Sequence, residues 1–340
     1  MIKQTIRTLM LTITLLAPGI SSAQGESGSV VNANQMPEIK RLLTLLQQPE
    51  DKIDFARVKL TIDKMVDPKI DIGANLKRID AIVGQIREMA GTNPTSDDKI
   101  KALRRYLYEP GPWNGFQAYL YDFDDPRGIK IANKLLPNYL ATKKGQCVSM
   151  PVLFIVLGQR LGLNVVASTA PEHVFVKYTD DAGVTYNLEA TSGATPQREV
   201  WMRQQTPMTD QAVANGIYLR KLSKRETAAV MAEVVAENFF ERKEYEKEIA
   251  VADVLLHFFP KSVGPMLYKG SAYGNLIRER YQTRYRTPRD IPSEERPDYL
   301  HLVEQSEFWY SKAESLGWRQ PDKLQEVRYL ETVNRVKSAQ

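Results

Sequence analysis

The chain has 340 residues, of which 43% are hydrophobic and 26% charged, so it is long enough to bury a large core and to form two domains. Its 46 basic and 41 acidic residues give a net charge of +5, a near balance that argues against a nucleic-acid-binding protein. The single cysteine, Cys147, excludes an internal disulfide, so its thiol is either buried and inert or kept for chemistry.

The N-terminal segment has the pattern of a secretory signal peptide. Lys3 and Arg7 precede the apolar run Leu9–Ala17, and small residues at 21–23 predict cleavage after Ala23. The run is too short to cross a bilayer, and no cysteine follows it to carry a lipid. Removing residues 1–23 takes away two positive charges and lowers the net charge from +5 to +3. We therefore expect a periplasmic or secreted protein without stable membrane insertion.

Helical patterns begin after a polar segment, residues 24–35, which we interpret as a flexible leader. Apolar residues then recur at helical spacing in four stretches, and capping residues precede the fourth. These stretches cover residues 39–46, 53–65, 76–89 and 97–107. We expect these helices to pack on the core and to carry no chemistry themselves.

Three aspartates in the loop Pro110–Gly128 resemble part of a calcium-binding loop but do not complete one. They are Asp122, Asp124 and Asp125. Pro126 takes the fifth place and Asn133 the twelfth, where a glutamate is needed. We expect a capped turn that leads into a helix over Ile129–Leu140. His257 and His301 have no cysteine or second histidine at ligand spacing, so we predict neither a metal site nor a cofactor.

Cys147 is predicted to stand at the start of a buried helix. It follows Gly145-Gln146, and the apolar segment Val148–Leu163 comes directly after it. Pro151 suits the first turn of that helix, where backbone N–H groups have no partner within the helix. The positive end of a helix dipole favours the thiolate, which is the nucleophilic form of cysteine.

Three strand-like runs follow this helix and carry a histidine and a carboxylate. The runs are Val165–Ala170, His173–Tyr178 and Val184–Glu189, with a turn at residues 180–183 between the last two. Alternation along a strand puts His173, Phe175 and Lys177 on one face of their strand. It also puts Asn187 and Glu189 on one face of theirs. A cysteine, a histidine and an acid or amide in this order suit a nucleophile, a base and a group that orients the base.

These residues resemble the transglutaminase-like superfamily, and more closely its bacterial branch in which tetratricopeptide repeats follow the core. The similarity lies in GQCVSMPVLFIVLGQRLGL, PEHVFVKY and YNLEATSG, which look like the Cys, His and Asp boxes. The resemblance implies a papain-like fold with Cys147 as nucleophile and His173 as base. Glu189, in Glu-Ala-Thr, takes the place of the usual aspartate and is one methylene longer, so Asn187 is the fallback orienting residue.

An oxyanion hole is expected beside the nucleophile. The backbone N–H of Cys147 would supply one donor, and a side chain just before it the other. The candidates for this second donor are Gln146, Asn138 and Tyr139. The sequence does not choose among them.

The C-terminal part is predicted to be helical. Residues 194–225 are mixed and polar, and we interpret them as a connector that crosses back over the core. In residues 226–340, Ala229–Pro260 fits one tetratricopeptide-type unit, and Lys269–Tyr273 begins a second that the polar insert Gln282–Asp298 interrupts. A plain helical domain is the alternative. Fewer than three repeats rarely stand alone, so we expect this part to lean on the core.

The predicted fold is α+β, with a helix-rich N-terminal layer, a papain-like transglutaminase core with an antiparallel sheet, and an α-helical repeat domain. The predicted divisions are a signal peptide at 1–23, a leader at 24–35, the core at 36–193, a connector at 194–225 and the helical domain at 226–340.

The leading functional hypothesis is an exported thiol enzyme, either a protease or amidase or a transglutaminase-type acyltransferase, acting on a protein or peptide of the cell envelope. Cys147 would form a thioester that water or an amine resolves, and hydrolysis is the simpler outcome because water needs no second binding site. The alternative is a catalytically inactive adaptor that binds a protein or peptide partner through its helical repeats. The glutamate at position 189 and the imperfect repeats motivate this alternative.

Overall fold

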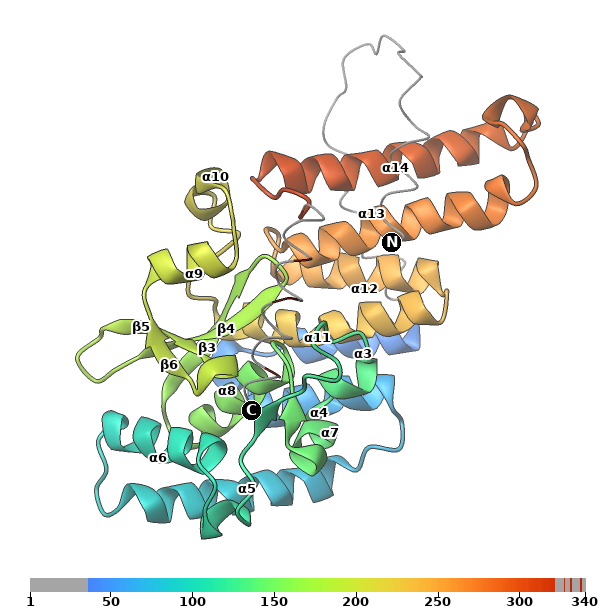
Figure 1. The fold of residues 1–340 in the computed structure, drawn as a ribbon. Helices are drawn as coiled ribbons and strands as arrows, with labels where there is room; N and C mark the ends of the chain where they lie inside the picture. The colour runs from blue at the N-terminus through green and yellow to red at the C-terminus, as the bar shows by residue number, and fades with distance from the viewer. Residues whose placement is uncertain (1–35, 322–326, 328–330, 332–336, 338–340) are drawn as a thin grey trace. The chain divides into compact units, whose positions relative to one another are not determined.

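The computed structural model describes residues 36–321 together with Val327, Glu331 and Lys337. The predicted signal peptide and leader therefore lie outside the described residues. The chain forms two compact units (Figure 1). The core unit comprises residues 45–235 and those from 316 onward, and the helical unit comprises the described residues before 45 and residues 236–315.

The N-terminal helices form where the apolar periodicity predicts them. Helix α3 spans Pro37–Leu46, α4 Phe55–Val66, α5 Ile72–Ala90 and α6 Ser96–Tyr108. In the core unit, the side chains of Asp54 and Asp71 cap α4 and α5, and Thr95 forms a capping box with Asp98 at the start of α6. These caps satisfy backbone N–H groups that have no partner inside the helix.

The segment between α6 and the nucleophile is less regular than the sequence predicts. In place of one helix over Ile129–Leu140, a 3₁₀ turn at Ile131–Lys134 precedes the short helix α7, Leu136–Thr142. The buried carboxylate of Asp63, on α4, accepts the backbone N–H of Leu136 at 2.8 Å and so caps a new helix there. Strand β1, Leu120–Tyr121, pairs in parallel with β2, Lys144–Gly145.

Helix α8, Ser149–Arg160, is the centre of the core unit. Its residues from Ser149 to Gly158 are all buried, and it contacts α4, α5, α6, α7 and strands β3 and β4. Gln159 anchors its far end, because its amide accepts the N–H of Phe55 and donates to the carbonyl of Ile53. The helix that follows Cys147 is therefore packed between these helices and strands.

The sheet beside α8 is antiparallel, in the order β3-β4-β5-β6 (Figure 1). Its first three strands match the predicted runs, and the short fourth strand was not predicted. The strands are β3 Asn164–Ala170, β4 His173–Thr179, β5 Thr185–Glu189 and β6 Thr195–Gln197. The Asp180 side chain accepts the N–H groups of Ala182 and Val184, which closes the turn between β4 and β5.

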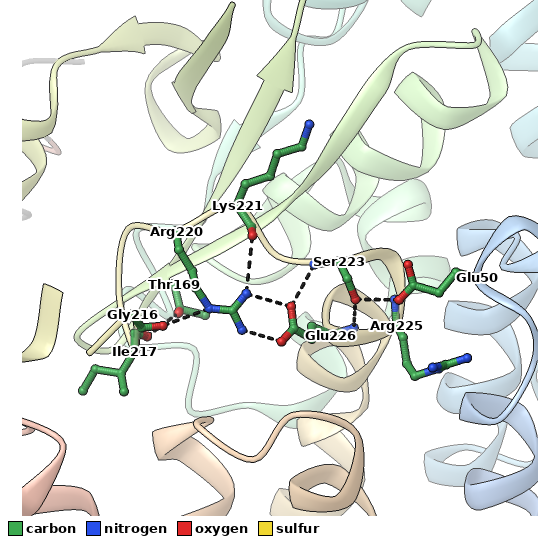
Figure 2. Close-up of polar contacts among 9 residues, drawn as sticks. All are labelled: Glu50, Thr169, Gly216, Ile217, Arg220, Lys221, Ser223, Arg225 and Glu226. Carbon is green, nitrogen blue, oxygen red and sulfur yellow. Dashed lines mark hydrogen bonds and ion pairs between the residues drawn. The ribbon is translucent and has the colours of Figure 1, made fainter. Parts of the chain in front are cut away.

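The segment after the short helices α9, Glu199–Gln205, and α10, Asp210–Ala214, covers the outer edge of β3. The N–H groups of Leu219 and Leu222 donate to carbonyls of β3, so this edge is not left open for another chain to pair with. Figure 2 shows how Arg220 holds the segment in place: its guanidinium pairs with both oxygens of Glu226. Nearby, Ser223 donates to Glu50 at 2.6 Å.

The described part of the helical unit contains four further helices and an insert between the last two. They are α11 Lys224–Glu241, which begins in the core unit, α12 Tyr245–Phe258, α13 Val263–Ile277 and α14 Arg296–Ser315. The last turn of α13 continues as a π-helix, Arg278–Gln282, in which buried Tyr281 donates to Asp298. Arg284 pairs with Glu295 in the insert, so these two charges are neutralised within the fold.

Candidate active site

The start of helix α8 holds Cys147 in place. Val148 is the N-cap residue, and Cys147 precedes it. The side-chain oxygen of Gln146 accepts the N–H groups of Val148 at 2.9 Å and Ser149 at 3.3 Å, and the Ser149 hydroxyl accepts the N–H of Gln146 at 3.1 Å. This reciprocal capping satisfies the first turn and leaves the half-buried thiol of Cys147 at the helix start.

His173 and Glu189 meet on the sheet. His173 is the first residue of β4 and Glu189 the last of β5, and Nε2 of His173 lies 2.7 Å from Oε2 of Glu189. The other carboxylate oxygen accepts the backbone N–H of Thr191 at 3.0 Å and its hydroxyl at 2.6 Å. Glu189 is 3% exposed, so little water surrounds its charge. Hydrogen bonds to both carboxylate oxygens fix its orientation.

Cys147 is near enough to the imidazole to affect its pKa. Since Glu189 occupies Nε2 of His173, Nδ1 is the ring nitrogen that remains for a thiol. Burial favours the neutral imidazole, but the Glu189 carboxylate and Cys147 outweigh it and raise the pKa of His173 to about 10. The pKa of Glu189 is lowered although burial opposes this, because the His173 ring and Thr191 favour its charged form.

Asn187, the fallback orienting residue, forms its side-chain hydrogen bond with Gln197. It pairs with Lys177 on β4 and with Gln197 on β6, and its side-chain amide donates to the Gln197 carbonyl at 3.2 Å. The structure therefore brings together Cys147, His173 and Glu189, and places Asn187 in the hydrogen bonding of the β5–β6 pair.

The three oxyanion candidates occupy different environments. Gln146 is fully buried, and its Nε2 has no hydrogen-bond partner among the residues the structure describes. Asn138 donates to the side chain of Asn133 at 3.2 Å. Tyr139 is buried, and its ring lies against Gly145, where an added Cβ would come within 2.5 Å of it. Only Gln146 combines a place next to Cys147 with a donor still to be satisfied.

Sequence reasoning did not single out three residues beside this site. Thr191 fixes Glu189, and Glu-Ala-Thr resembled a family box without indicating a role for the threonine. The Tyr108 hydroxyl, from the end of α6, is buried without a hydrogen-bond partner in the described chain; burial, and then the Glu189 charge, raise the pKa of Tyr108. The carbonyl oxygen of Glu172 lies 3.8 Å from Sγ of Cys147. Contacts of this kind depend on the fold and leave no local sequence pattern.

The aspartates of the Pro110–Gly128 loop hold that loop together. Asp125 accepts the N–H groups of Ile129 and Lys130, and Asn133 donates to both Asp122 and Asp125. Within the described part of the chain, no group of three or more histidine, cysteine or acidic side chains has the geometry to hold a metal ion. The described helices also include none that is long and apolar enough to cross a membrane.

Part of the chain is similar to a known protein family. A family model described as "Transglutaminase-like superfamily" matches residues 74–233, which include all three residues gathered at the site. A "UPF0162 protein" of Buchnera aphidicola subsp. Baizongia pistaciae (strain Bp) is 24% identical over 161 residues, 46% of this chain and 59% of that protein. The chain thus covers less than two thirds of this relative's length. No solved structure is significantly similar to the chain. Residues 74–233 form a transglutaminase-like domain, of a superfamily that includes cysteine-dependent enzymes.

Proposed function

We propose that the chain is an exported thiol enzyme that acts on amide or peptide bonds, with Cys147 as nucleophile, His173 as acid and base, and Glu189 as the group that orients His173. One observation carries the proposal: a buried carboxylate holds one nitrogen of an imidazole whose pKa the sole thiol also raises. This is the relation of nucleophile, base and orienting group that covalent acyl transfer requires.

In the acylation step, the Cys147 thiolate forms a bond to the substrate's carbonyl carbon, and the π electrons of the carbonyl move onto its oxygen. Nε2 of Gln146, buried and unpartnered, and the Cys147 backbone N–H are the donors we assign to this oxyanion. When the intermediate collapses, the carbon–nitrogen bond breaks and the His173 imidazolium gives its proton to the leaving amine. The product is a thioester on Cys147 and a neutral imidazole.

The second step releases the acyl group. The neutral imidazole of His173 takes a proton from water or from an amine as that nucleophile attacks the thioester carbon. The carbon–sulfur bond then breaks, the thiolate returns, and the imidazolium is restored. Water gives hydrolysis, and an amine gives transfer. We favour hydrolysis, because it needs no second binding site.

The test is the rate of Cys147 alkylation by iodoacetamide against pH, with His173→Ala beside the wild type and Cys147→Ser as the blank. We expect fast labelling at neutral pH in the wild type and a loss of about tenfold or more in H173A, because the His173 imidazolium favours the thiolate, which is the form that reacts. His301→Ala, which removes an exposed histidine on α14, is the matched control and should label like the wild type.

The opposite result would favour the adaptor. Slow labelling that is indifferent to His173, with full labelling after unfolding, would mean that the thiol is inert. The search would then move to a protein or peptide partner of the helical unit, whose tetratricopeptide-like character is itself a proposal because the family match ends at residue 233.

A further inference from the structure

The hairpin that joins β3 to β4 places a strained residue beside the thiol. Ala170 pairs with His173 across the hairpin, so Pro171 and Glu172 are its two turn residues. Glu172 has a φ of 55°, in the left-handed region that glycine adopts freely and that disfavours a residue with a long side chain. Such strain gathers at functional sites. A glutamate therefore stands at a position that suits glycine.

The Glu172 carboxylate stands close to Cys147. The backbone oxygen of Glu172 lies 3.8 Å from Sγ, and covalent geometry then keeps the carboxylate within roughly 10 Å of the sulfur. Glu172 is exposed, and its carboxylate forms no ion pair with the residues that the structure describes. Its charge does act on a neighbour, because burial, and then the Glu172 carboxylate, raise the pKa of Tyr218. The charges of His173 and Glu189, by contrast, are paired with each other.

We propose that Glu172 is a specificity-determining residue, and that it selects amide or peptide substrates with an ammonium or guanidinium group next to the carbonyl under attack. The proposal rests on the proposed function of Cys147. A substrate whose carbonyl reaches Sγ passes the β3–β4 turn, so a cation within a few bonds of that carbonyl comes within about one Debye length of the carboxylate. An anionic group at the same place is repelled.

The experiment replaces the unknown substrate with small thiol reagents of different charge. Two methanethiosulfonates, one with a trimethylammonium group and one with a sulfonate group, each form a mixed disulfide with Cys147 and release methanesulfinate. The measured quantity is the ratio of the cationic to the anionic rate within one protein, which cancels differences in thiolate reactivity. Opposite charges at roughly 10 Å predict that Glu172→Gln lowers this ratio about 3- to 10-fold at low salt.

Three further variants test whether the charge at position 172 sets the ratio of the two rates. Glu172→Lys should invert the preference, and the difference between wild type and E172Q should shrink as salt rises. Glu88→Gln, which removes an exposed glutamate of α5, should leave the ratio at the wild-type value. Glu172→Gly should melt no lower than the wild type, because glycine relieves the left-handed strain, and it should nevertheless lose the cationic preference.

The outcomes separate this inference from the function on which it rests. If Cys147 reacts readily with both reagents but E172Q and E172K leave the ratio unchanged, the role of Glu172 is refuted and the thiol enzyme stands. If Cys147 reacts with neither reagent until the protein is unfolded, both proposals fail. A ratio that falls in E172Q and inverts in E172K supports Glu172 as the selector of cationic substrates.

Discussion

At the scale of single residues, the length of Glu189 is what lets it reach His173. The register pairs Lys177 with Asn187 and Val176 with Leu188, so the residue opposite Glu189 is Phe175, and His173 lies on the diagonal. Diagonal neighbours on adjacent strands are roughly 7–8 Å apart. The extra methylene that made a glutamate look unsuited to the aspartate position thus spans this offset, and the 2.7 Å contact results.

Shortening this side chain should separate the pair. Glu189→Asp keeps the charge but withdraws the carboxylate from the His173 ring, whereas Glu189→Gln keeps the length and loses the charge. We expect E189D to slow alkylation of Cys147 at neutral pH by about tenfold, because an imidazolium without its partner stabilises the thiolate less well. Iodoacetamide kinetics check this, and an unchanged rate in E189D would count against the orienting role of Glu189.

The same pair predicts a pH dependence of stability. His173 has a pKa raised from 6.5 to about 10, so its contribution is full below pH 6.5 and is lost as the pH rises toward 10. Glu189, with a lowered pKa, contributes above its usual pKa and loses that contribution on acidification. In E189Q the main cause of the raised His173 pKa is gone. Urea unfolding from pH 6 to 10 should show a free-energy difference from the wild type that is largest near pH 6 and shrinks toward pH 10.

At the scale of elements, a buried ion pair on α4 is connected to α7 through Asp63. Lys59 and Asp63 are both fully buried, with 2.6 Å between Nζ and Oδ1, and the other oxygen of Asp63 caps Leu136. Burial raises the pKa of Asp63 although Lys59 opposes it. The carboxylate is therefore charged at a cost that only its partner and the α7 backbone offset. This contact decides where α7 begins, and so how the chain enters the nucleophile segment.

Replacing Lys59 should reveal the free-energy cost of burying the Asp63 charge. Lys59→Met is expected to lower the free energy of unfolding by about 3–5 kcal/mol at neutral pH, because the Asp63 charge is left buried and unpaired. A group with a raised pKa stabilises the folded state at low pH and less as the pH rises, so acidification should restore part of the loss. Denaturant unfolding at pH 4 and pH 7 measures this. The double variant Lys59→Met/Asp63→Asn, which keeps an acceptor for Leu136, should recover stability at pH 7, and failure to recover would contradict the electrostatic account.

At the scale of the whole molecule, the candidate site lies within the transglutaminase-like domain. The family match covers residues 74–233, and Cys147, His173 and Glu189 all lie in the core unit. Export is a second proposal at this scale, drawn from Lys3, Arg7, the apolar run after them and the small residues before Gln24.

Export has a direct test. The protein expressed from its full sequence in a bacterial host should appear in the periplasm with Gln24 as its first residue, which N-terminal sequencing of the fractionated protein detects. Ala23→Arg, which removes the small residue before the expected cleavage, should accumulate as the longer precursor. An unprocessed wild-type protein in the cytoplasmic fraction would refute the proposal.

The sequence alone was sufficient to predict the helices and strands that neighbouring residues determine. Periodicity and neighbouring residues predicted three features that the structure contains. They are helix caps such as Thr95, the start of a helix just after Gly145-Gln146-Cys147, and the strands on either side of the Asp180 turn. The same patterns made Cys147, His173 and Glu189 candidates, because chemistry-bearing residue types stood at the ends of predicted elements.

Only the tertiary structure decided the rest, because those features depend on residues far apart in the chain. The choice of Glu189 over Asn187 follows from the strand register, which places Glu189 diagonal to His173, whereas the Asn187 amide donates to Gln197. The break before α7 is set by Asp63, 73 residues earlier. The position of Glu172 beside the thiol depends on how a hairpin packs on a helix start. Local periodicity carries no information about such pairings, and burial then gives them their energy.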